Sequence, residues 1–140
     1  MKVNLFFETT DMDGMVTNTK QVAVMEKNED GYRLVYVESI VENGDKIKST
    51  MTVNEQSLRV LRTGGVTCDF MYGDAMVHNT VYGTPYGNIP LMLKTKQYYF
   101  DEKWSTQDAF SICVDVRYDM IFGEQSPMPM RIRLKITPME

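Results

Sequence analysis

The repeated two-residue turn signals constrain the fold of this chain more than any other feature. Glycine stands next to Asp, Asn or another Gly at intervals along the first two thirds of the sequence. These pairs are Asp13-Gly14, Asp30-Gly31, Asn43-Gly44, Gly64-Gly65, Gly73-Asp74 and Gly87-Asn88. Such pairs supply the positive backbone φ angles that tight hairpins require, so each predicts a connection between two antiparallel strands.

Between the turns, apolar and polar residues alternate with a period of two. In the segment 110–122, Phe110, Ile112 and Val114 share one face, while Ser111 and Asp115 lie on the other. The segment 130–137 repeats this pattern. Period-two alternation is typical of an antiparallel sheet with one wetted face, and helical periodicity is sustained nowhere.

The pattern predicts about ten strands. They are expected near residues 2–10, 15–28, 31–41, 45–53, 57–63, 65–72, 75–83, 88–99, 108–122 and 129–137. Residues 101–107 are expected to hold a helical turn. We therefore predict a single all-β domain over residues 1–140.

A meander of this length leaves two exposed edges unless it curls and closes. An up-and-down barrel of about 8–10 strands removes both edges. A two-sheet sandwich is the alternative, but its Greek-key crossovers need longer connections than these turns provide. We expect the antiparallel meander to close into a barrel.

Composition limits the partners and the location of the protein. The 140 residues carry a net charge of -4, which gives no overall attraction to nucleic acid or anionic lipid. The first residues lack a signal-type apolar region, and two cysteines are too few for a disulfide framework. We expect a cytoplasmic monomer or weak homodimer with no nucleic-acid partner and no membrane partner.

The sole histidine, His78, is the only candidate for His-dependent catalysis. With a two-residue turn at Gly73-Asp74, Cys68 faces Asn79 and His78 faces Asp69 across the hairpin. A thiol–imidazole pair is therefore not expected, because the two side chains would lie on opposite faces. An exposed cross-strand pair of Asp69 and His78 is expected instead.

Metal binding finds little support. The run Asp11-Met12-Asp13-Gly14 resembles the start of a calcium loop, but the twelfth position is Val22 rather than an acidic residue. A hairpin turn explains this run better. No zinc-ligand spacing is present, and we expect no metal, no cofactor and no catalytic residue.

Basic and aromatic residues interleave over 94–100, a combination that can hold single-stranded nucleic acid. Asp101 and Glu102 interrupt the run. We interpret it as the two faces of one strand.

Three polar residues occupy positions that the alternation assigns to the core: Glu38, Arg62 and Thr95. A buried charge is costly unless it finds a partner or water. Arg62 and Glu38 therefore form either a structural ion pair at one end of the barrel or the polar rim of a ligand cavity. Twelve methionines, which pack adaptably, are compatible with such a cavity.

The segment Tyr82-Gly83-Thr84-Pro85-Tyr86-Gly87, followed by alternating apolar residues and Thr95, resembles the YwiB-like family. Leu61-Arg62-Thr63-Gly64 and the segments 112–122 and 130–136 agree with the same family. These are bacterial proteins of unknown function with a lipocalin-type (calycin) barrel. The resemblance implies this fold and a bacterial cytoplasmic setting, and it assigns no activity.

The resemblance also gives weight to Arg62 and to the segment 82–87. The sequence then predicts a non-catalytic barrel that binds a small, largely apolar ligand inside. The candidate ligand-binding residues are Glu38, Arg62, Tyr82, Thr84, Tyr86 and Thr95. The alternative is a structural or protein-interaction module whose barrel is filled by side chains, and an enzyme is the third hypothesis.

Overall fold

A computed structural model describes residues 1–39 and 46–139 and contains ten strands. Their bounds are β1 (Lys2–Thr10), β2 (Val16–Asn28), β3 (Gly31–Ser39), β4 (Lys46–Val53), β5 (Ser57–Gly64), β6 (Cys68–Gly73), β7 (Val77–Thr84), β8 (Gly87–Thr106), β9 (Ala109–Ile121) and β10 (Met128–Pro138). All named pairings are antiparallel, and the described residues form no helix. The predicted turn at Asn43-Gly44 lies outside the described residues.

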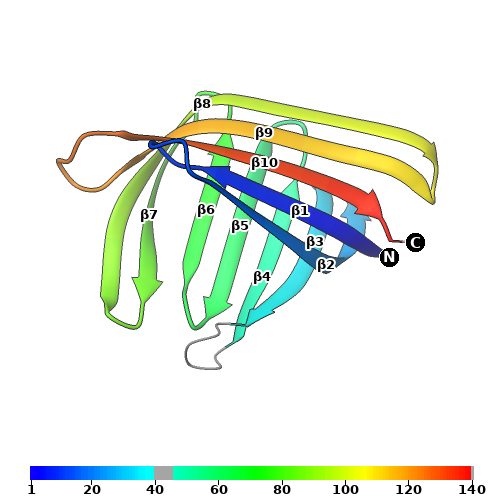
Figure 1. Cartoon of the computed structure of the whole chain (residues 1–140), viewed down its shortest axis with the longest axis horizontal. Coiled ribbons are helices and arrows are strands. Elements are labelled where there is room, and N and C mark those ends of the chain that lie inside the picture. The colour runs from blue at the N-terminus through cyan, green and yellow to red at the C-terminus, as the bar shows by residue number, and fades with distance from the viewer. Residues whose placement is uncertain (40–45, 140) are drawn as a thin grey trace.

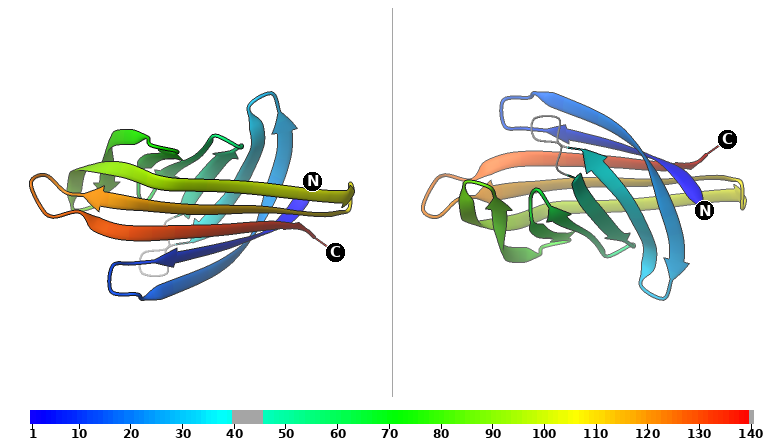
Figure 2. Two further views of the ribbon diagram at one scale, coloured as in Figure 1. Left: turned by 90° about the horizontal axis from the view of Figure 1, so that it is seen from above. Right: turned by 90° about the horizontal axis from the view of Figure 1, so that it is seen from below.

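The strands form one curved sheet in the order β6-β5-β4-β3-β2-β1-β10-β9-β8-β7. Strands adjacent in the sequence pair with each other, except β6 and β7, and β1 pairs with β10 from Val3–Pro138 to Thr10–Arg131. The sheet therefore wraps round until β6 and β7 meet (Figures 1 and 2). The predicted all-β meander that nearly closes into a barrel is confirmed.

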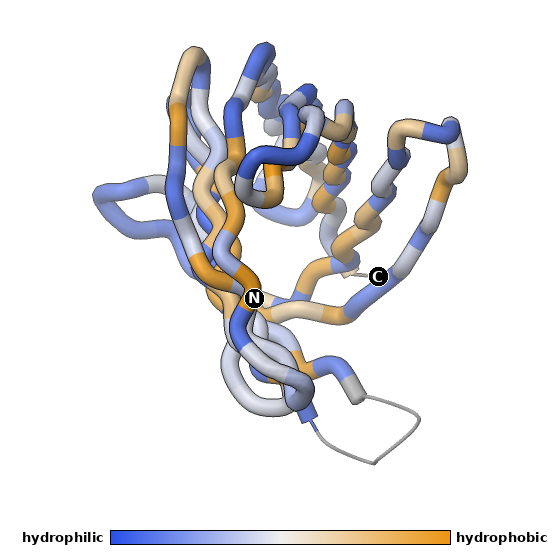
Figure 3. The backbone as a smooth tube through the Cα atoms, turned by 90° about the vertical axis from the view of Figure 1, so that its left-hand side faces the viewer, coloured by the Kyte–Doolittle hydropathy of each residue, from blue (hydrophilic) through white to orange (hydrophobic). Residues whose placement is uncertain are grey.

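Alternate residues of each strand point inward. Figure 3 shows hydrophobic and hydrophilic positions alternating along the strands that surround the interior. The inward faces of β9 and β10 are apolar as predicted. The fully buried side chains include Val3, Leu5, Leu34, Met51, Val53, Leu58, Leu93, Ile112, Val114, Val116 and Ile136. This packing of apolar surface stabilises the barrel, because about 25 cal/mol is gained per Å² removed from water.

The predicted helical turn at 101–107 is wrong, because β8 continues as a strand to Thr106. Trp104 explains the extension. Its indole stacks on Phe110 with ring centroids 4.2 Å apart and on Tyr32 at 6.1 Å. The Tyr32 hydroxyl also donates a hydrogen bond of 2.6 Å to Glu102. Long-range aromatic packing therefore outweighs the local turn preference.

The segment 94–100 is divided between the two faces of β8. A β-bulge between Thr95 and Gln97 shifts the register, so that Tyr98 and Phe100 pack against the core. Lys96 extends outward, where its ammonium group lies 3.1 Å from Asp119. The interpretation of this run as two strand faces agrees with the structure.

The connection between β6 and β7 differs from the predicted two-residue turn at Gly73-Asp74. The turn closes one residue later, where the Met76 amide donates to the Gly73 carbonyl at 3.0 Å. Ala75 has a φ of 56° there. The predicted register of β6 against β7, which places Cys68 opposite Asn79, is wrong, because the backbone bridge joins Thr67 to Gly83.

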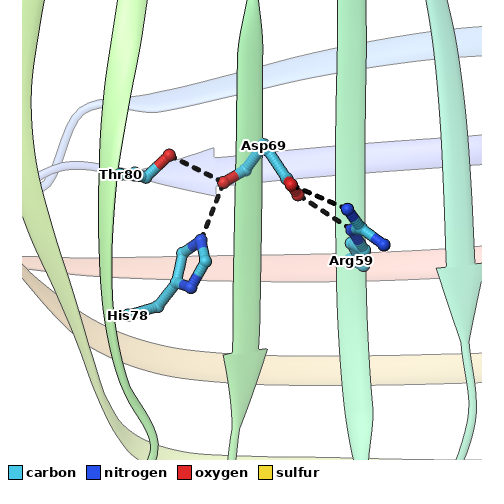
Figure 4. A network of polar contacts seen from close by, with 4 residues as sticks. All are labelled: Arg59, Asp69, His78 and Thr80. Carbon is cyan, nitrogen blue, oxygen red and sulfur yellow. Dashed lines mark hydrogen bonds and ion pairs between the residues drawn. The ribbon is translucent and has the colours of Figure 1, made fainter.

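The seam between β6 and β7 combines a backbone bridge with side-chain hydrogen bonds to Asp69, which Figure 4 shows. One backbone bridge joins Thr67 and Gly83. Farther along, His78 Nε2 and Thr80 Oγ1 lie 2.8 and 2.9 Å from the main-chain oxygen of Asp69. A carbonyl oxygen only accepts, so both side chains donate to it.

The expected Asp69–His78 side-chain pair is therefore wrong, because His78 contacts the main chain instead. The Asp69 carboxylate turns to Arg59, which donates two hydrogen bonds of 2.9 and 2.7 Å. These hydrogen bonds hold the pKa of Asp69 below its usual value.

Removing the side-chain donors should loosen this seam locally. The double variant His78→Leu, Thr80→Val deletes both hydrogen bonds to Asp69, and each hydrogen bond contributes about 1 kcal/mol. We expect amide hydrogen exchange in β6 and β7 to rise about tenfold or more, with little change in β9 and β10.

Thr52→Val is the control, because Thr52 lies in β4, which pairs with a strand on each side. It should leave exchange in β6 and β7 unchanged. A uniform rise over all strands of the double variant, or no rise at all, would contradict the assignment of the seam.

Candidate functional site

The barrel holds a cavity of about 420 Å³ where β2 and β3 separate. β2 pairs with β3 only from Val24–Val35 to Asn28–Gly31, whereas its earlier residues pair only with β1. The later residues of β3 pair only with β4. The cavity occupies this fork and is lined by Leu5, Phe7, Thr9, Thr17, Thr19, Gln21, Tyr36, Glu38 and Arg62.

A row of four inward residues crosses the sheet beside the cavity. Tyr36 of β3 pairs with Ser49 of β4, which pairs with Arg62 of β5, which pairs with Cys68 of β6. We call these four residues the polar row. The next inward row toward the core is apolar and comprises Leu34, Met51, Val60 and Phe70. The polar row therefore marks the boundary between the packed core and the cavity.

Glu38 is the acidic neighbour of the polar row. Its carboxylate lies 4.0 Å from Arg62 Nη2, and each of the two side chains is 26% exposed. Burial acts to lower the pKa of Arg62, but the charge of Glu38, together with Tyr36 and Cys68, raises it. Arg62 therefore stays protonated, and the pair is a loose ion pair.

Burial raises the pKa of the Tyr36 hydroxyl, and nearby Arg62 opposes the rise only in part. Burial likewise raises the pKa of the Cys68 thiol against the opposing charge of Arg62. Both groups are thus neutral near pH 7. A protonated, buried thiol is a poor nucleophile, so the site lacks the thiolate that cysteine chemistry requires.

Two buried polar atoms beside the cavity have no hydrogen-bond partner among the described residues: Ser49 Oγ and Arg62 Nε. Ser49 is completely buried. Most buried polar groups in proteins have a partner, and an unpaired one costs about 1–3 kcal/mol. Asp119 Oδ1, away from the cavity, also has no hydrogen-bond partner among the described residues, but the Lys96 ammonium group lies 3.1 Å from it and balances its charge. The polar row therefore has unused capacity to donate hydrogen bonds.

Metal and acid–base chemistry receive no support from the described part of the chain. It contains no group of three His, Cys, Asp or Glu side chains placed to hold a metal ion. The carboxylate of Asp11 accepts hydrogen bonds from the amides of Asp13 and Met15, so this acidic run builds a turn. His78 is engaged at the seam.

Of the residues predicted to bind a ligand, the structure brings Arg62 and Glu38 together at the cavity. Glu38 shares the inward face of β3 with Leu34 and Tyr36, as the alternation predicts. Tyr82 lies on β7 and packs against Phe70, with ring centroids 6.0 Å apart. It therefore lies beside the core near the seam.

Thr84, Tyr86 and Thr95 have other surroundings. Thr84 Oγ1 donates to the carbonyl of Gly87 at 2.8 Å and so stabilises the β7–β8 turn. Tyr86 is 99% exposed at that turn. Thr95 is buried, and its Oγ1 accepts a hydrogen bond from the Gly73 amide at 3.3 Å. None of the three lines the cavity at the fork.

Sequence analysis did not identify Ser49 or the polar residues of β2 as parts of the site. A signal was present, because Ser49 shares the inward positions of Met51 and Val53. Gln21 and Thr19 similarly precede the buried Ala23 at alternate positions. Polar residues at positions that continue the alternation of a buried strand face would therefore have predicted these parts of the site.

Comparison with known proteins identifies the family. Residues 6–136 match the family described as a domain of unknown function, DUF1934. The chain belongs to this family. A search of curated proteins gives no match. Within residues 1–39 and 46–139, no helix is long and apolar enough to cross a membrane.

A solved structure shares the fold of this chain. The crystal structure of the ywiB protein from Bacillus subtilis matches with a TM-score of 0.79 at 18% sequence identity. The match covers 99% of this chain and 92% of that one. The resemblance to the YwiB-like family is thus confirmed, and the shared barrel fits a lipocalin-like fold.

A double-mutant cycle will show whether Glu38 and Arg62 serve mainly as a structural pair. Because the two groups lie 4.0 Å apart and remain partly exposed, we expect a coupling energy below about 1 kcal/mol. The cycle uses Glu38→Gln, Arg62→Gln and the double variant, with free energies of unfolding from urea titration. A coupling of about 3 kcal/mol or more would instead identify a tight buried pair whose role is stability.

Proposed function

We propose that this protein is a non-catalytic barrel that binds a small organic ligand in the cavity between β2 and β3. The cavity itself carries this proposal. Its volume of about 420 Å³ falls within the usual range of small-molecule sites. Its wall combines apolar side chains such as Leu5 and Phe7 with a few convergent polar groups, as such sites commonly do.

The residues that line the cavity favour a ligand that is more polar than the sequence predicts. Several threonines, Gln21, Glu38 and Arg62 contribute polar surface, while Leu5, Phe7 and Tyr36 supply apolar surface. A ligand with an apolar body and one polar end matches this wall better than a wholly apolar one. The proposed site includes Arg62 and Glu38 and leaves out Thr84, Tyr86 and Thr95.

The alternative, a barrel filled by side chains, accounts for only part of the interior. The region around Leu34, Met51 and Val116 is closely packed. Beyond the polar row, by contrast, the strands diverge around the cavity. The proposal includes a monomer or weak homodimer in the cytoplasm that acts without nucleic acid or membrane, and the net charge of -4 favours this reading.

Binding of the uncharged dye N-phenyl-1-naphthylamine tests the proposal. The dye fluoresces strongly in apolar surroundings, and we expect saturable binding of one dye per chain. Gln21→Trp should weaken that binding at least tenfold, because the indole would occupy the cavity that Gln21 lines.

Val22→Trp is the matched control. Val22 is the next residue of β2 and is exposed on the outer surface, so its replacement adds the same indole outside the barrel. Thermal unfolding should show that both variants remain folded. No saturable binding to the wild type, or equal loss in both variants, would refute the cavity as the binding site.

A further inference from the structure

We infer that the ligand carries a carboxylate, and that Arg62, with Ser49 and Tyr36 beside it, binds this group. The inference rests on the proposed function and specifies the polar end of the ligand. The polar row, which supplies these three side chains, runs along the cavity side of the packed core.

The register places the three side chains next to one another. Ser49 pairs directly with both Tyr36 and Arg62, and directly paired residues of antiparallel strands hold their Cβ atoms about 4.5–5.5 Å apart. Tyr36 and Arg62 line the cavity wall, and Ser49 lies buried between them. Tyr36 and Arg62 therefore lie on one part of the wall, with Ser49 on the strand between them.

Donors outnumber acceptors in this cluster. Arg62 provides five N–H groups, while Ser49 and Tyr36 each provide a hydroxyl. Among residues 1–39 and 46–139, the carboxylate paired with Arg62 is that of Glu38, which lies 4.0 Å from Arg62 Nη2, beyond hydrogen-bond distance. Arg62 Nε and Ser49 Oγ have no partner among the described residues. Arg62 Nε and Ser49 Oγ are themselves buried, so an oxygen acceptor in the cavity would bind the Nη groups of Arg62, which lines the wall.

Charge favours a carboxylate over a phosphate as that acceptor. A carboxylate is a monoanion whose two oxygens match the planar fork of an arginine. Glu38 already contributes one negative charge beside Arg62. A phosphate dianion would gather three negative charges around one guanidinium in a partly buried site, and the repulsion among them would oppose binding.

The rest of the cavity matches the remainder of such a ligand. Leu5 and Phe7 present apolar surface on β1, across the cavity from Arg62 on β5. A short-chain or aromatic carboxylic acid would place its apolar body there and its carboxylate at the polar row. Glu38 would compete with the ligand carboxylate for Arg62. This competition would lower the affinity for the ligand.

Octanoate and octanamide form a matched pair of probes, because they have the same chain and differ in the charged group. Each is titrated against bound N-phenyl-1-naphthylamine. We expect octanoate to displace the dye at about tenfold lower concentration than octanamide, since a charge-assisted hydrogen bond is about twice as strong as a neutral one.

Two substitutions at the site should act in opposite directions. Arg62→Gln should remove the preference for octanoate over octanamide, with both displacement concentrations corrected for the dye affinity measured for that variant. Glu38→Gln should strengthen octanoate binding several-fold, because it removes the competing carboxylate, and should leave octanamide unaffected.

Arg33→Gln is the control for the loss of an arginine. Arg33 lies 4.0 Å from Glu26 on the exposed outer face, the same separation as in the pair at the cavity. Its removal should leave the preference for octanoate unchanged. Thermal unfolding of every variant shows whether a loss of binding reflects loss of the fold.

The carboxylate inference would be overturned if octanoate and octanamide bound equally, or if the preference for octanoate survived Arg62→Gln. In either case, saturable dye binding would still support the proposed function. Inorganic phosphate that competes with octanoate at similar concentration would also overturn it in favour of a general anion site. If the dye itself fails to bind the wild type, the proposed function fails first, and direct calorimetry with octanoate then tests the carboxylate site alone.

Discussion

Pairing of β1 with β10 is the constraint on which the whole structure depends. It joins the two ends of the chain from Val3–Pro138 to Thr10–Arg131 and turns an open meander into a curved sheet with one enclosed face. Only an enclosed face can bury alternate residues of every strand at once. The apolar positions of β9 and β10 become core for this reason, and the cavity gains a wall on β1.

The barrel is closed unevenly, and the uneven closure produces the β6–β7 seam and the candidate site at the fork. At the β6–β7 seam, side-chain hydrogen bonds to Asp69 supplement a single backbone bridge. At the fork, the residues of β2 before Val24 and those of β3 after Val35 do not pair with each other, so inward side chains there lack neighbours across the gap. Polar residues occupy these inward positions because they remain accessible to water or to a ligand.

Much of the fold could be predicted from the sequence, because turn signals and period-two alternation are local properties. They gave the strands, the inward face of 110–122 and the direction of Glu38. The failures occurred where distant contacts decide the outcome. Trp104 stacks between Phe110 and Tyr32 and extends β8. A turn one residue later than predicted, with a different strand register, changed the pairing around Asp69.

The sequence by itself determined which residues of each strand share a face, since successive side chains of a strand point to opposite sides. It thereby placed Arg62 and Glu38 among inward residues. Only the tertiary structure decided that Tyr36, Ser49 and Arg62 form one row and that the strands part beside them. The reason is physical: neighbours across strands depend on register and sheet curvature, which arise from the packing of the whole barrel.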